Sequence, residues 1–305
     1  MGKIAFLFSG QGSQYPGMGK ELTQRSAKAA DVFEMADKIR PGTSAQCFEG
    51  TKDELSKTCI TQPCLFCTDL AAAAALEDNG ISADYLAGFS LGEVPALAFG
   101  GYMSSEDAFK YVCRRGELMD KCAQETSGMM YAVVGLTSSV VQDIAAGFAD
   151  AYPVNYNCET QTVVACSSHT GAEFSAAVKA SGGKALKLRV SGGFHSPFMK
   201  PAAEALAKEF SDISFKNGII PVISNVTAHE YADASYMWKQ VSSPVLWQKT
   251  IEKLVTLGVT HFIEVGPGKT LTGLMAKIAP ELTALSVEDS KTLDNTLEVL
   301  GIVKK

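Results

Sequence analysis

Short apolar runs alternate with amphipathic stretches along the chain, and the spacing of the apolar positions separates strands from helices. Four apolar runs have the length of buried strands: Ile4–Phe8, Tyr85–Ala87, Val222–Ser224 and His261–Val265. Helical spacing is found between them, at Lys20–Asp37, Thr61–Asn79, Gly92–Phe99, Ser104–Ala123, Pro201–Phe210 and Pro244–Leu257. Because strands that alternate with helices favour a largely parallel sheet flanked by helices, we predict an α/β fold.

The segment Thr61–Asn79 carries helix signals and two cysteines. Thr61 is a suitable N-cap, and Pro63 would then lie in the first turn. Cys64 and Cys67 form a CxxC motif, with no second pair and no histidine nearby in the sequence. We therefore expect small buried thiols on an apolar helix face, rather than a zinc or redox site.

The middle of the chain contains more strand-like segments. Six segments run in the order strand, helix, strand, strand, helix, strand: Met129–Gly135, Ser138–Ala149, Val154–Tyr156, Thr162–Cys166, Gly171–Ala180 and Ala185–Val190. This βαββαβ order is that of the ferredoxin-like unit. We therefore predict a small ferredoxin-like subdomain at 125–193, inserted into a large subdomain made of residues 1–124 and 194–305.

Charge and composition narrow the class of protein. The chain has 27 Lys and Arg against 33 Asp and Glu, a net charge of −6, which argues against a nucleic-acid partner because such proteins usually carry a basic stripe. The longest clean apolar run near the start, Ile4–Phe8, is too short for a signal peptide or a membrane span. The eight cysteines fit a chain without a disulfide framework. We expect a cytoplasmic protein that does not contact a membrane.

Gly88-Phe89-Ser90-Leu91-Gly92 is the sharpest chemical motif in the sequence. It fits the pattern GxSxG and lies between an expected strand and an expected helix, which is the context of a nucleophile elbow. The glycines permit a tight turn that lifts the Ser90 hydroxyl to the carboxyl edge of the sheet. The backbone N–H of Leu91, at the start of the new helix, can stabilise an oxyanion.

A serine nucleophile needs a base, and the chain has four histidines. His195 lies in the loop 191–197, where two glycines precede it and a proline follows, so this loop can present the side chain across a cleft. His261 opens an expected strand, His229 follows a polar stretch, and His169 precedes an expected helix. His195 is the preferred base, although spacing alone leaves the other three open.

Arg115 falls on the apolar face of the helix expected at Ser104–Ala123, whereas the adjacent Arg114 does not. A guanidinium on an inward face is costly unless it meets an anion. One interpretation is a clamp for a substrate carboxylate. The others are an internal salt bridge and a long stem that reaches solvent, and the residues by themselves favour these two.

Two glycine-rich segments lack the full pattern of a nucleotide-binding loop. Gly266–Thr270 contains GKT, but Ile263 stands where a P-loop needs a glycine. Gly10-Gln11-Gly12 lacks the third glycine of a dinucleotide fingerprint, because Tyr15 occupies that position. We therefore expect no nucleotide cofactor in either loop.

Taken together, these residues resemble the malonyl-CoA:acyl carrier protein transacylases, the acyltransferase family of fatty acid and polyketide synthesis. The resemblance spans nearly the whole chain and rests on six segments in the order of the family: Gly10–Gln14, Gly88–Glu93, Arg115-Gly116, Asn155–Asn157, Gly193–Ser196 and Gly266–Gly268. It implies an α/β-hydrolase-like core with the inserted ferredoxin-like subdomain. The form Gly193-Phe194-His195 is typical of malonyl-selecting members.

The resemblance also implies a Ser-His dyad. Ser90 would attack the thioester carbonyl of malonyl-CoA while His195 takes the proton of the hydroxyl. The backbone N–H groups of Gln11 and Leu91 would hold the oxyanion, and Arg115 would hold the malonyl carboxylate. The acyl-serine would then pass to the phosphopantetheine thiol of an acyl carrier protein by a ping-pong route.

In this family a backbone carbonyl, rather than an aspartate, orients the histidine. The matching position is Gln240, four residues before the proline of Ser243-Pro244-Val245. The resemblance implies no cofactor and no metal, because malonyl-CoA is the substrate and phosphopantetheine is carried by the acyl carrier protein. It also leads us to expect a monomer.

Phe89 departs from the family pattern, which usually has histidine before the serine. We predict that activity survives this change with altered extender selectivity.

An acidic carrier protein would bind best to a basic surface, and four basic residues cluster in the inserted subdomain: Lys179, Lys184, Lys187 and Arg189. A merely solvated face explains these four residues at least as well.

Three alternative functions stay open. A serine hydrolase of the esterase or thioesterase kind shares the elbow, but it usually places an acid between serine and histidine and needs no arginine clamp. A trans-acting polyketide synthase acyltransferase would use the same residues on another carrier. A non-catalytic carrier-protein binder is disfavoured by the intact Ser90 and His195.

Overall fold

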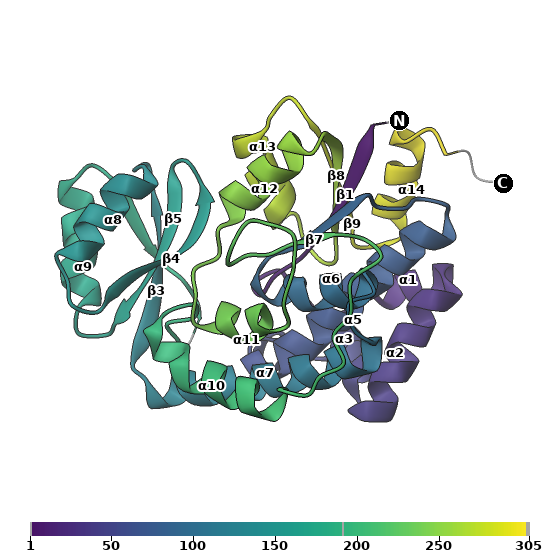
Figure 1. Cartoon of the computed structure of the whole chain (residues 1–305), viewed down its shortest axis with the longest axis horizontal. Coiled ribbons are helices and arrows are strands. Elements are labelled where there is room, and N and C mark those ends of the chain that lie inside the picture. The colour runs from purple at the N-terminus through teal and green to yellow at the C-terminus, as the bar shows by residue number, and fades with distance from the viewer. Residues whose placement is uncertain (1, 191, 303–305) are drawn as a thin grey trace.

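The computed structural model describes residues 2–190 and 192–302, and in them it shows two separate sheets (Figure 1). The strands of the first, sheet A, are β1 (Lys3–Phe8), β2 (Tyr85–Gly88), β7 (Val222–Ile223), β8 (Val259–Val265) and β9 (Thr283–Val287). Their order is β7-β2-β1-β8-β9, and all neighbouring pairs are parallel. The structure confirms the predicted α/β fold.

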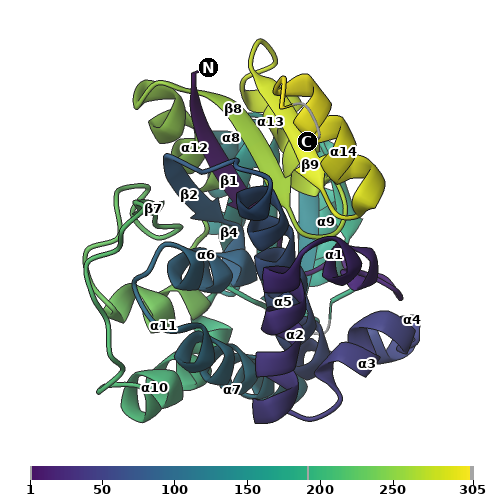
Figure 2. The same ribbon diagram turned by 90° about the vertical axis from the view of Figure 1, so that its right-hand side faces the viewer.

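Alternate side chains of β1 build two hydrophobic layers, one on each face of sheet A. Phe6 and Phe8 belong to one cluster of buried side chains, whereas Ala5 and Leu7 belong to another. Because successive residues of a strand point to opposite faces, an unbroken apolar run suits a strand that is covered on both sides. Figure 2 shows helices on both sides of the sheet.

The helices divide between these two layers. Those whose buried residues join the cluster of Phe6 are α1 (Lys20–Arg25), α2 (Ala27–Ile39), α3 (Thr43–Glu49), α4 (Lys52–Leu55), α5 (Thr58–Asp78), α6 (Glu93–Phe99), α7 (Ser105–Glu125), α10 (Lys200–Glu209), α11 (Ser235–Val241) and α14 (Ser290–Val299). Those on the side of Leu7 are α12 (Trp247–Thr256) and α13 (Thr270–Ile278).

Sheet B is antiparallel and lies at the other end of the molecule (Figure 1). Its elements are β3 (Gly128–Val134), α8 (Ser138–Ala146), β4 (Ala151–Cys158), β5 (Gln161–Ser167), α9 (Gly171–Ala180) and β6 (Lys184–Lys187). The strand order is β4-β5-β3-β6, and the two helices pack on a core that includes Val133, Val164 and Phe174. We propose that residues 125–193 form the small subdomain and that 1–124 with 194–305 form the large one.

Strand β4 also contacts the large part of the chain. Val245, just before α12, donates its N–H to the carbonyl of Val154 at 2.8 Å, and Tyr156 donates back to the carbonyl of Val245 at 2.9 Å. These bonds hold Asn155 between them, at the junction of the two parts. Sheet B is therefore fixed to the large part of the chain by β4.

The predicted helix Lys20–Asp37 is wrong in one respect, because it consists of two helices that meet at Ser26. Ser26 has extended backbone angles, and its hydroxyl accepts the N–H of Ala29 at 3.0 Å. This serine is a strong N-cap, so a new helix starts there. The helical spacing of apolar residues continues across Ser26, so the sequence pattern did not indicate two helices.

Thr61 does not cap α5, contrary to the sequence prediction. The helix begins at Thr58, after Lys57, so Pro63 lies in the second turn rather than the first. The Thr61 hydroxyl donates to the backbone carbonyl of Lys57 at 3.0 Å and is fully buried. The helix could begin earlier because a threonine can satisfy its hydroxyl within a helix by bonding the preceding turn.

The apolar pattern also missed several elements. The helices α3, α4, α11, α13 and α14 and the strand β9 were not predicted. Three of these helices are seven residues long or shorter, and β9 is only partly buried over most of its length. Short or half-exposed elements give few apolar positions from which a period can be read.

Helix α5 alone, among the described helices, is long and apolar enough to cross a membrane by length and composition. The most apolar stretch of this helix is 89% buried inside the protein, however, which is the position of a core helix.

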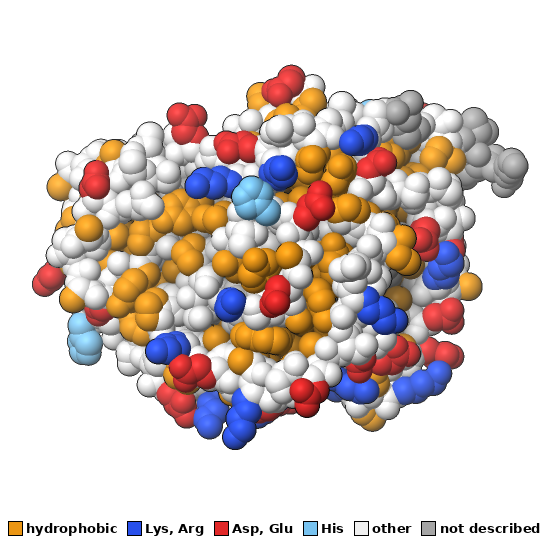
Figure 3. Space-filling view, viewed as in Figure 1, with side chains coloured by type: hydrophobic (Ala, Val, Ile, Leu, Met, Phe, Trp, Pro, Cys, Tyr) orange, Lys and Arg blue, Asp and Glu red, His pale blue; other side chains and the backbone are white. Residues whose placement is uncertain are grey.

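The surface carries charges of both signs. On the face drawn in Figure 3, acidic and basic side chains are interspersed.

Candidate active site

Two loops leave sheet A at the same edge, because β1 and β2 are parallel neighbours and Phe8 pairs with Gly88. The loop after β1 contains Gln11, and the turn after β2 contains Ser90. The carboxyl edge of a parallel sheet is where such folds usually place their ligands. The sheet therefore brings together two segments that are far apart in the sequence.

The glycines of the elbow are required by close backbone packing. A Cβ atom on Gly88 would lie 2.0 Å from the carbonyl carbon of Gly92, and one on Gly92 would lie 2.3 Å from the carbonyl oxygen of Phe8. Ser90 itself has a φ of 54°, in the left-handed region that L-residues rarely adopt. This strained turn, followed by the 3-10 helix η1 (Ser90–Gly92) and then α6, is the arrangement expected of a nucleophile elbow.

Both ends of the Ser90 backbone are held by side chains. The N–H of Ser90 donates to Asn225 Oδ1 at 2.8 Å, and the carbonyl of Ser90 accepts from Gln240 Nε2 at 2.7 Å. Asn225 also donates to the carbonyl of Gly88 at 2.7 Å. These bonds stabilise a backbone conformation that costs about 1–3 kcal/mol on its own.

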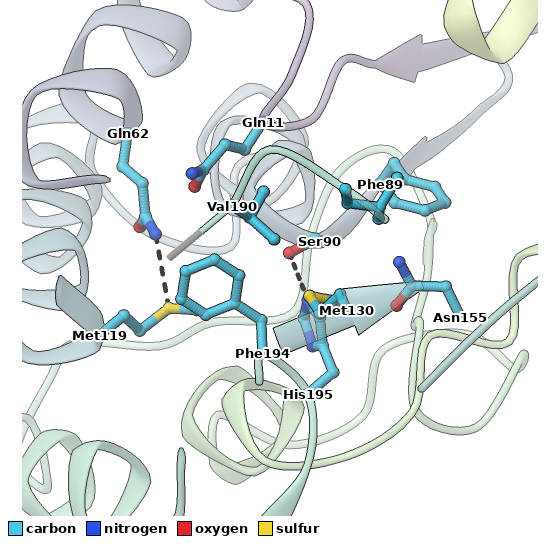
Figure 4. Close-up of a pocket in the computed structure, with 11 residues that line it drawn as sticks. Gln11, Gln62, Phe89, Ser90, Met119, Met130, Asn155, Val190, Phe194 and His195 are labelled. Carbon is cyan, nitrogen blue, oxygen red and sulfur yellow. Dashed lines mark hydrogen bonds between the residues drawn. The ribbon is translucent and has the colours of Figure 1, made fainter. Parts of the chain in front are cut away.

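His195 faces Ser90 across the pocket (Figure 4). Its Nε2 lies 2.6 Å from Ser90 Oγ, and its Nδ1 lies 2.9 Å from the carbonyl oxygen of Gln240. A carbonyl oxygen can only accept, so Nδ1 carries the proton and the lone pair of Nε2 faces the serine. Burial, together with the charge of Arg115, lowers the pKa of His195 to about 4. The imidazole is therefore neutral near pH 7, as a general base must be.

Arg115 is fully buried in α7 and points at the same hydroxyl. Its Nη1 donates to Gln62 Oε1 at 2.8 Å, while its Nη2 donates to Gln240 Oε1 at 2.8 Å and to Ser90 Oγ at 3.3 Å. Its Nε has no partner within the described part of the chain, and no ion pair found there includes it. Burial lowers the pKa of Arg115. The two structural interpretations from the sequence, a salt bridge and a stem reaching solvent, do not describe this side chain.

The pocket at Ser90 is lined partly by apolar side chains from both parts of the chain. Its lining includes Met119 of α7, Met130 of β3, Asn155 of β4 and Phe194 (Figure 4). Gln11 also lines it and donates from Nε2 to Thr58 Oγ1 at 3.3 Å. The pocket is therefore closed by sheet B on one side and by the helical layer on the other.

Leu91 follows Ser90 in η1 and is buried. Gly10 approaches the elbow so closely that a Cβ atom on it would lie 2.7 Å from the carbonyl oxygen of Phe89. The loop that carries Gln11 and the turn that carries Leu91 are thus in contact. The assignment of their N–H groups to an oxyanion hole stays a prediction.

Phe89 lies at the pocket and packs edge-on against Trp247 of α12, with ring centroids 5.3 Å apart. A histidine at this position would place a polar ring in that aromatic contact. The side chain before the nucleophile is therefore part of an apolar wall in this protein.

The other candidate groups from the sequence lie elsewhere. His261 is within β8, where its Nδ1 lies 2.9 Å from Thr260 Oγ1. Cys64 and Cys67 are buried in α5 as free thiols. No group of three or more His, Cys, Asp or Glu that could hold a metal occurs in residues 2–190 and 192–302. Ser191 of the histidine loop lies outside the described residues.

Comparison with known proteins gives the same family over the whole chain. Residues 5–292 match the family model described as the acyl transferase domain. The malonyl CoA-acyl carrier protein transacylase of Bacillus subtilis (strain 168) is 38% identical over 98% of both chains, and that of Escherichia coli (strain K12) is 35% identical over 98% of this chain and 100% of its own. The chain belongs to this acyltransferase family.

Solved structures of family members have the same fold. A malonyl CoA-acyl carrier protein transacylase from Clostridium perfringens superposes with a TM-score of 0.95 at 36% identity, covering 98% of this chain and 97% of that one. A malonyl-transacylase in complex with a type II polyketide synthase acyl carrier protein superposes with a TM-score of 0.93 at 33% identity, covering 97% and 99% of the two chains.

Three polar residues that line or support the acyltransferase pocket were not assigned a role from the sequence: Gln62, Glu93 and Asn225. Asn225 follows β7 at the carboxyl edge of sheet A, a position that would have marked it once β7 was placed beside β2. Gln62 is 1% exposed in the apolar helix α5, where a polar side chain needs a partner. Burial raises the pKa of Glu93 to about 8, although its N–H donors and Arg115 oppose that rise.

Proposed function

We propose that this protein transfers a malonyl group from malonyl-CoA to the phosphopantetheine thiol of an acyl carrier protein, through a malonyl-serine at Ser90. One observation carries the proposal. A fully buried arginine without an acidic partner in the described residues donates to the nucleophile's own hydroxyl at 3.3 Å. The hydrogen-bond partners of this guanidinium are two amides and a hydroxyl, which leaves it able to bind an anion, and the acyl group of malonyl-CoA ends in one.

In the first half-reaction, Ser90 Oγ attacks the thioester carbonyl carbon as His195 Nε2 takes the hydroxyl proton. The negative charge that develops on the carbonyl oxygen is held by the backbone N–H groups of Gln11 and Leu91. The carbon–sulfur bond then breaks, and His195 returns the proton to the sulfur of CoA. The product is a malonyl ester of Ser90 and free CoA.

Arg115 gives the malonyl group its place in the pocket. The guanidinium binds the malonyl carboxylate, and Gln62 and Gln240 hold its two amino groups from either side. A planar guanidinium with fixed neighbours selects an acyl group that carries a carboxylate at the right distance from the carbonyl. An acetyl group would offer this guanidinium no carboxylate to bind.

In the second half-reaction, the phosphopantetheine thiol of the carrier protein enters the same pocket. His195 takes the thiol proton as the sulfur attacks the ester carbonyl, and it returns that proton to Ser90 Oγ when the ester bond breaks. The oxyanion is held as before. The two half-reactions follow each other in a ping-pong order. No cofactor is needed, because His195 accepts and returns the proton in each half-reaction.

The carrier protein would approach beside Lys187 and Arg189. These two side chains are exposed and line an open groove that shares Gln11, Leu188 and Val190 with the pocket at Ser90. Carrier proteins are usually acidic, so basic side chains at the mouth of the pocket suit them. Lys184 is exposed on the same strand, and Lys179 lies in the last turn of α9.

A hydrolase is the second candidate, because it would share the elbow and the dyad. Two features weigh against it: His195 is oriented by a backbone carbonyl rather than an acid, and a neutral ester has no carboxylate for Arg115 to bind.

We place the transferase in the cytoplasm and expect it to act as a monomer, as the sequence predicts.

The transfer is tested with purified protein, malonyl-CoA and holo-acyl carrier protein, by measuring the malonyl-carrier product at several concentrations of both substrates. We expect parallel lines in double-reciprocal plots, with fatty acid and polyketide carriers assayed separately. Release of free malonate without malonyl-carrier product would favour the hydrolase and contradict the proposal.

A further inference from the structure

Glu93 is a buried acid beside the nucleophile, and no step of the proposed reaction uses it. It is the first residue of α6 and is 1% exposed. A carboxylate this deep in the protein is costly unless its oxygens are bonded. The reason for its presence should therefore lie in its partners.

Both oxygens of Glu93 accept N–H groups. Oε1 accepts the backbone N–H of Asn225 at 2.6 Å, and Oε2 accepts Gln240 Nε2 at 2.9 Å. Asn225 and Gln240 are the two residues that hold the ends of the Ser90 backbone. One carboxylate thus fixes both supports of the strained elbow.

The Gln240 amide can bond Ser90, Glu93 and Arg115 together in only one of its two orientations. Its Nε2 donates to Ser90 and Glu93, and its Oε1 accepts Arg115 Nη2. If the amide were turned over, its oxygen would meet the carbonyl of Ser90 and its N–H groups would meet the guanidinium. A partner oxygen that accepts at this position holds the amide in the observed sense, and Oε2 of Glu93 is such an acceptor.

We propose that Glu93 is a positioning residue for acyl selectivity: by fixing the orientation of the Gln240 amide, it keeps the Arg115 guanidinium aimed at the place of the malonyl carboxylate. The inference rests on the proposed function, because it assigns the selectivity of that same pocket. Two hydrogen bonds make the connection: Gln240 Nε2 donates to Glu93 Oε2 at 2.9 Å, and Arg115 Nη2 donates to Gln240 Oε1 at 2.8 Å.

The substitution Glu93→Gln tests whether Glu93 sets acyl selectivity or only stabilises the fold. A glutamine cannot accept at both ends, so one of the contacts with Asn225 and Gln240 is lost. We measure the rates of Ser90 acylation from malonyl-CoA and from acetyl-CoA and compare the ratio of the two kcat/KM values. Loss of the hydrogen bond that fixes the buried Gln240 amide should lower the malonyl-to-acetyl ratio about tenfold.

A double-mutant cycle tests whether Glu93 acts through Arg115. In an Arg115→Ala background, E93Q should leave the malonyl-to-acetyl ratio unchanged, because the guanidinium that it positions is absent. If E93Q leaves the ratio unchanged in the native background, or lowers it equally in both, the inference is overturned. Failure of the native protein to load malonyl would instead refute the proposed function, independently of Glu93.

A control variant and a second test variant complete the experiment. Glu264→Gln removes another 1% exposed acid, which accepts the backbone N–H groups of Leu271 and Thr272 at the start of α13, and it should leave the ratio unchanged. If E93Q does not fold, Gln240→Met removes the amide while keeping the carbonyl that orients His195. This variant should lower the ratio to the same extent, and an unchanged ratio would overturn the inference.

Discussion

The Nε2 atom of His195 lies 2.6 Å from the Oγ atom of Ser90, although 105 positions separate the two residues in the sequence. Both have positive φ angles, 61° for His195 and 54° for Ser90. Two non-glycine residues in this rare conformation, facing each other in one pocket, indicate a backbone that is strained to bring their side chains together.

The pH dependence of acylation should show a base that stays neutral far into the acidic range. Burial and the charge of Arg115 lower the pKa of His195 to about 4, so the rate should hold from neutral pH downward and fall only as the pH approaches that value. In Arg115→Ala the neighbouring positive charge is gone and the pKa of His195 should rise. The acidic limb, measured with acetyl-CoA as donor, should therefore move to higher pH. A limb that stays in place or moves lower would contradict this electrostatic coupling.

Arg115→Ala should change acyl selectivity. Loss of a charged, two-pronged contact with the malonyl carboxylate should lower kcat/KM for malonyl-CoA by roughly 100-fold, while acetyl-CoA loading is kept or increased. The adjacent Arg114 offers a matched control, because it pairs with Glu209 and Glu117 on the surface. Arg114→Ala should leave both rates unchanged. Equal losses with the two donors in R115A would count against the carboxylate clamp.

Gly92→Ala should destabilise the elbow and abolish acylation. The new Cβ atom would lie 2.3 Å from the carbonyl oxygen of Phe8 and 2.5 Å from that of Ser9, so the turn must shift. We expect a loss of about 1–3 kcal/mol in the free energy of unfolding, measured by denaturant titration. Gly273→Ala is the control, because nothing lies within 4 Å of a Cβ there and alanine favours a helix. Wild-type stability and activity in G92A would refute the close packing of β1 on the elbow.

The double substitution Lys184→Glu and Lys187→Glu tests the carrier-protein surface. Reversed charge at the mouth of the pocket should raise KM for the acyl carrier protein and spare KM for malonyl-CoA. Lys291→Glu is the control, since this exposed residue of α14 lies at the opposite end of the molecule (Figure 1). Equal effects on both substrates, or none on the carrier, would contradict docking at β6.

The parallel sheet and the elbow could be predicted from the sequence because their signals are local. An apolar run such as Ile4–Phe8 followed by a glycine-rich loop indicates a buried strand and its carboxyl end. The GxSxG pattern around Ser90 needs only its flanking strand and helix to be interpreted. The βαββαβ order of the middle segment was readable for the same reason, since its apolar segments are well spaced.

The supports of the site could not be predicted, because they depend on contacts between distant segments. Asn225 bonds to Ser90 from 135 residues away, and Gln240 from 150. Nothing near Asn225 in the sequence indicates a partner, and the family resemblance gave Gln240 only the role of orienting His195 through its backbone carbonyl. The amide partners of Arg115 were equally unpredictable, since Gln62 and Gln240 lie on α5 and α11 and the latter helix was not predicted.

Intact-protein mass spectrometry after mixing with malonyl-CoA tests the central claim most directly. The native protein should gain the mass of one malonyl group, peptide mapping should place it on Ser90, and holo-acyl carrier protein should remove it. Ser90→Ala should gain nothing. Absence of the adduct from the native protein, or an adduct that persists in Ser90→Ala, would contradict the account.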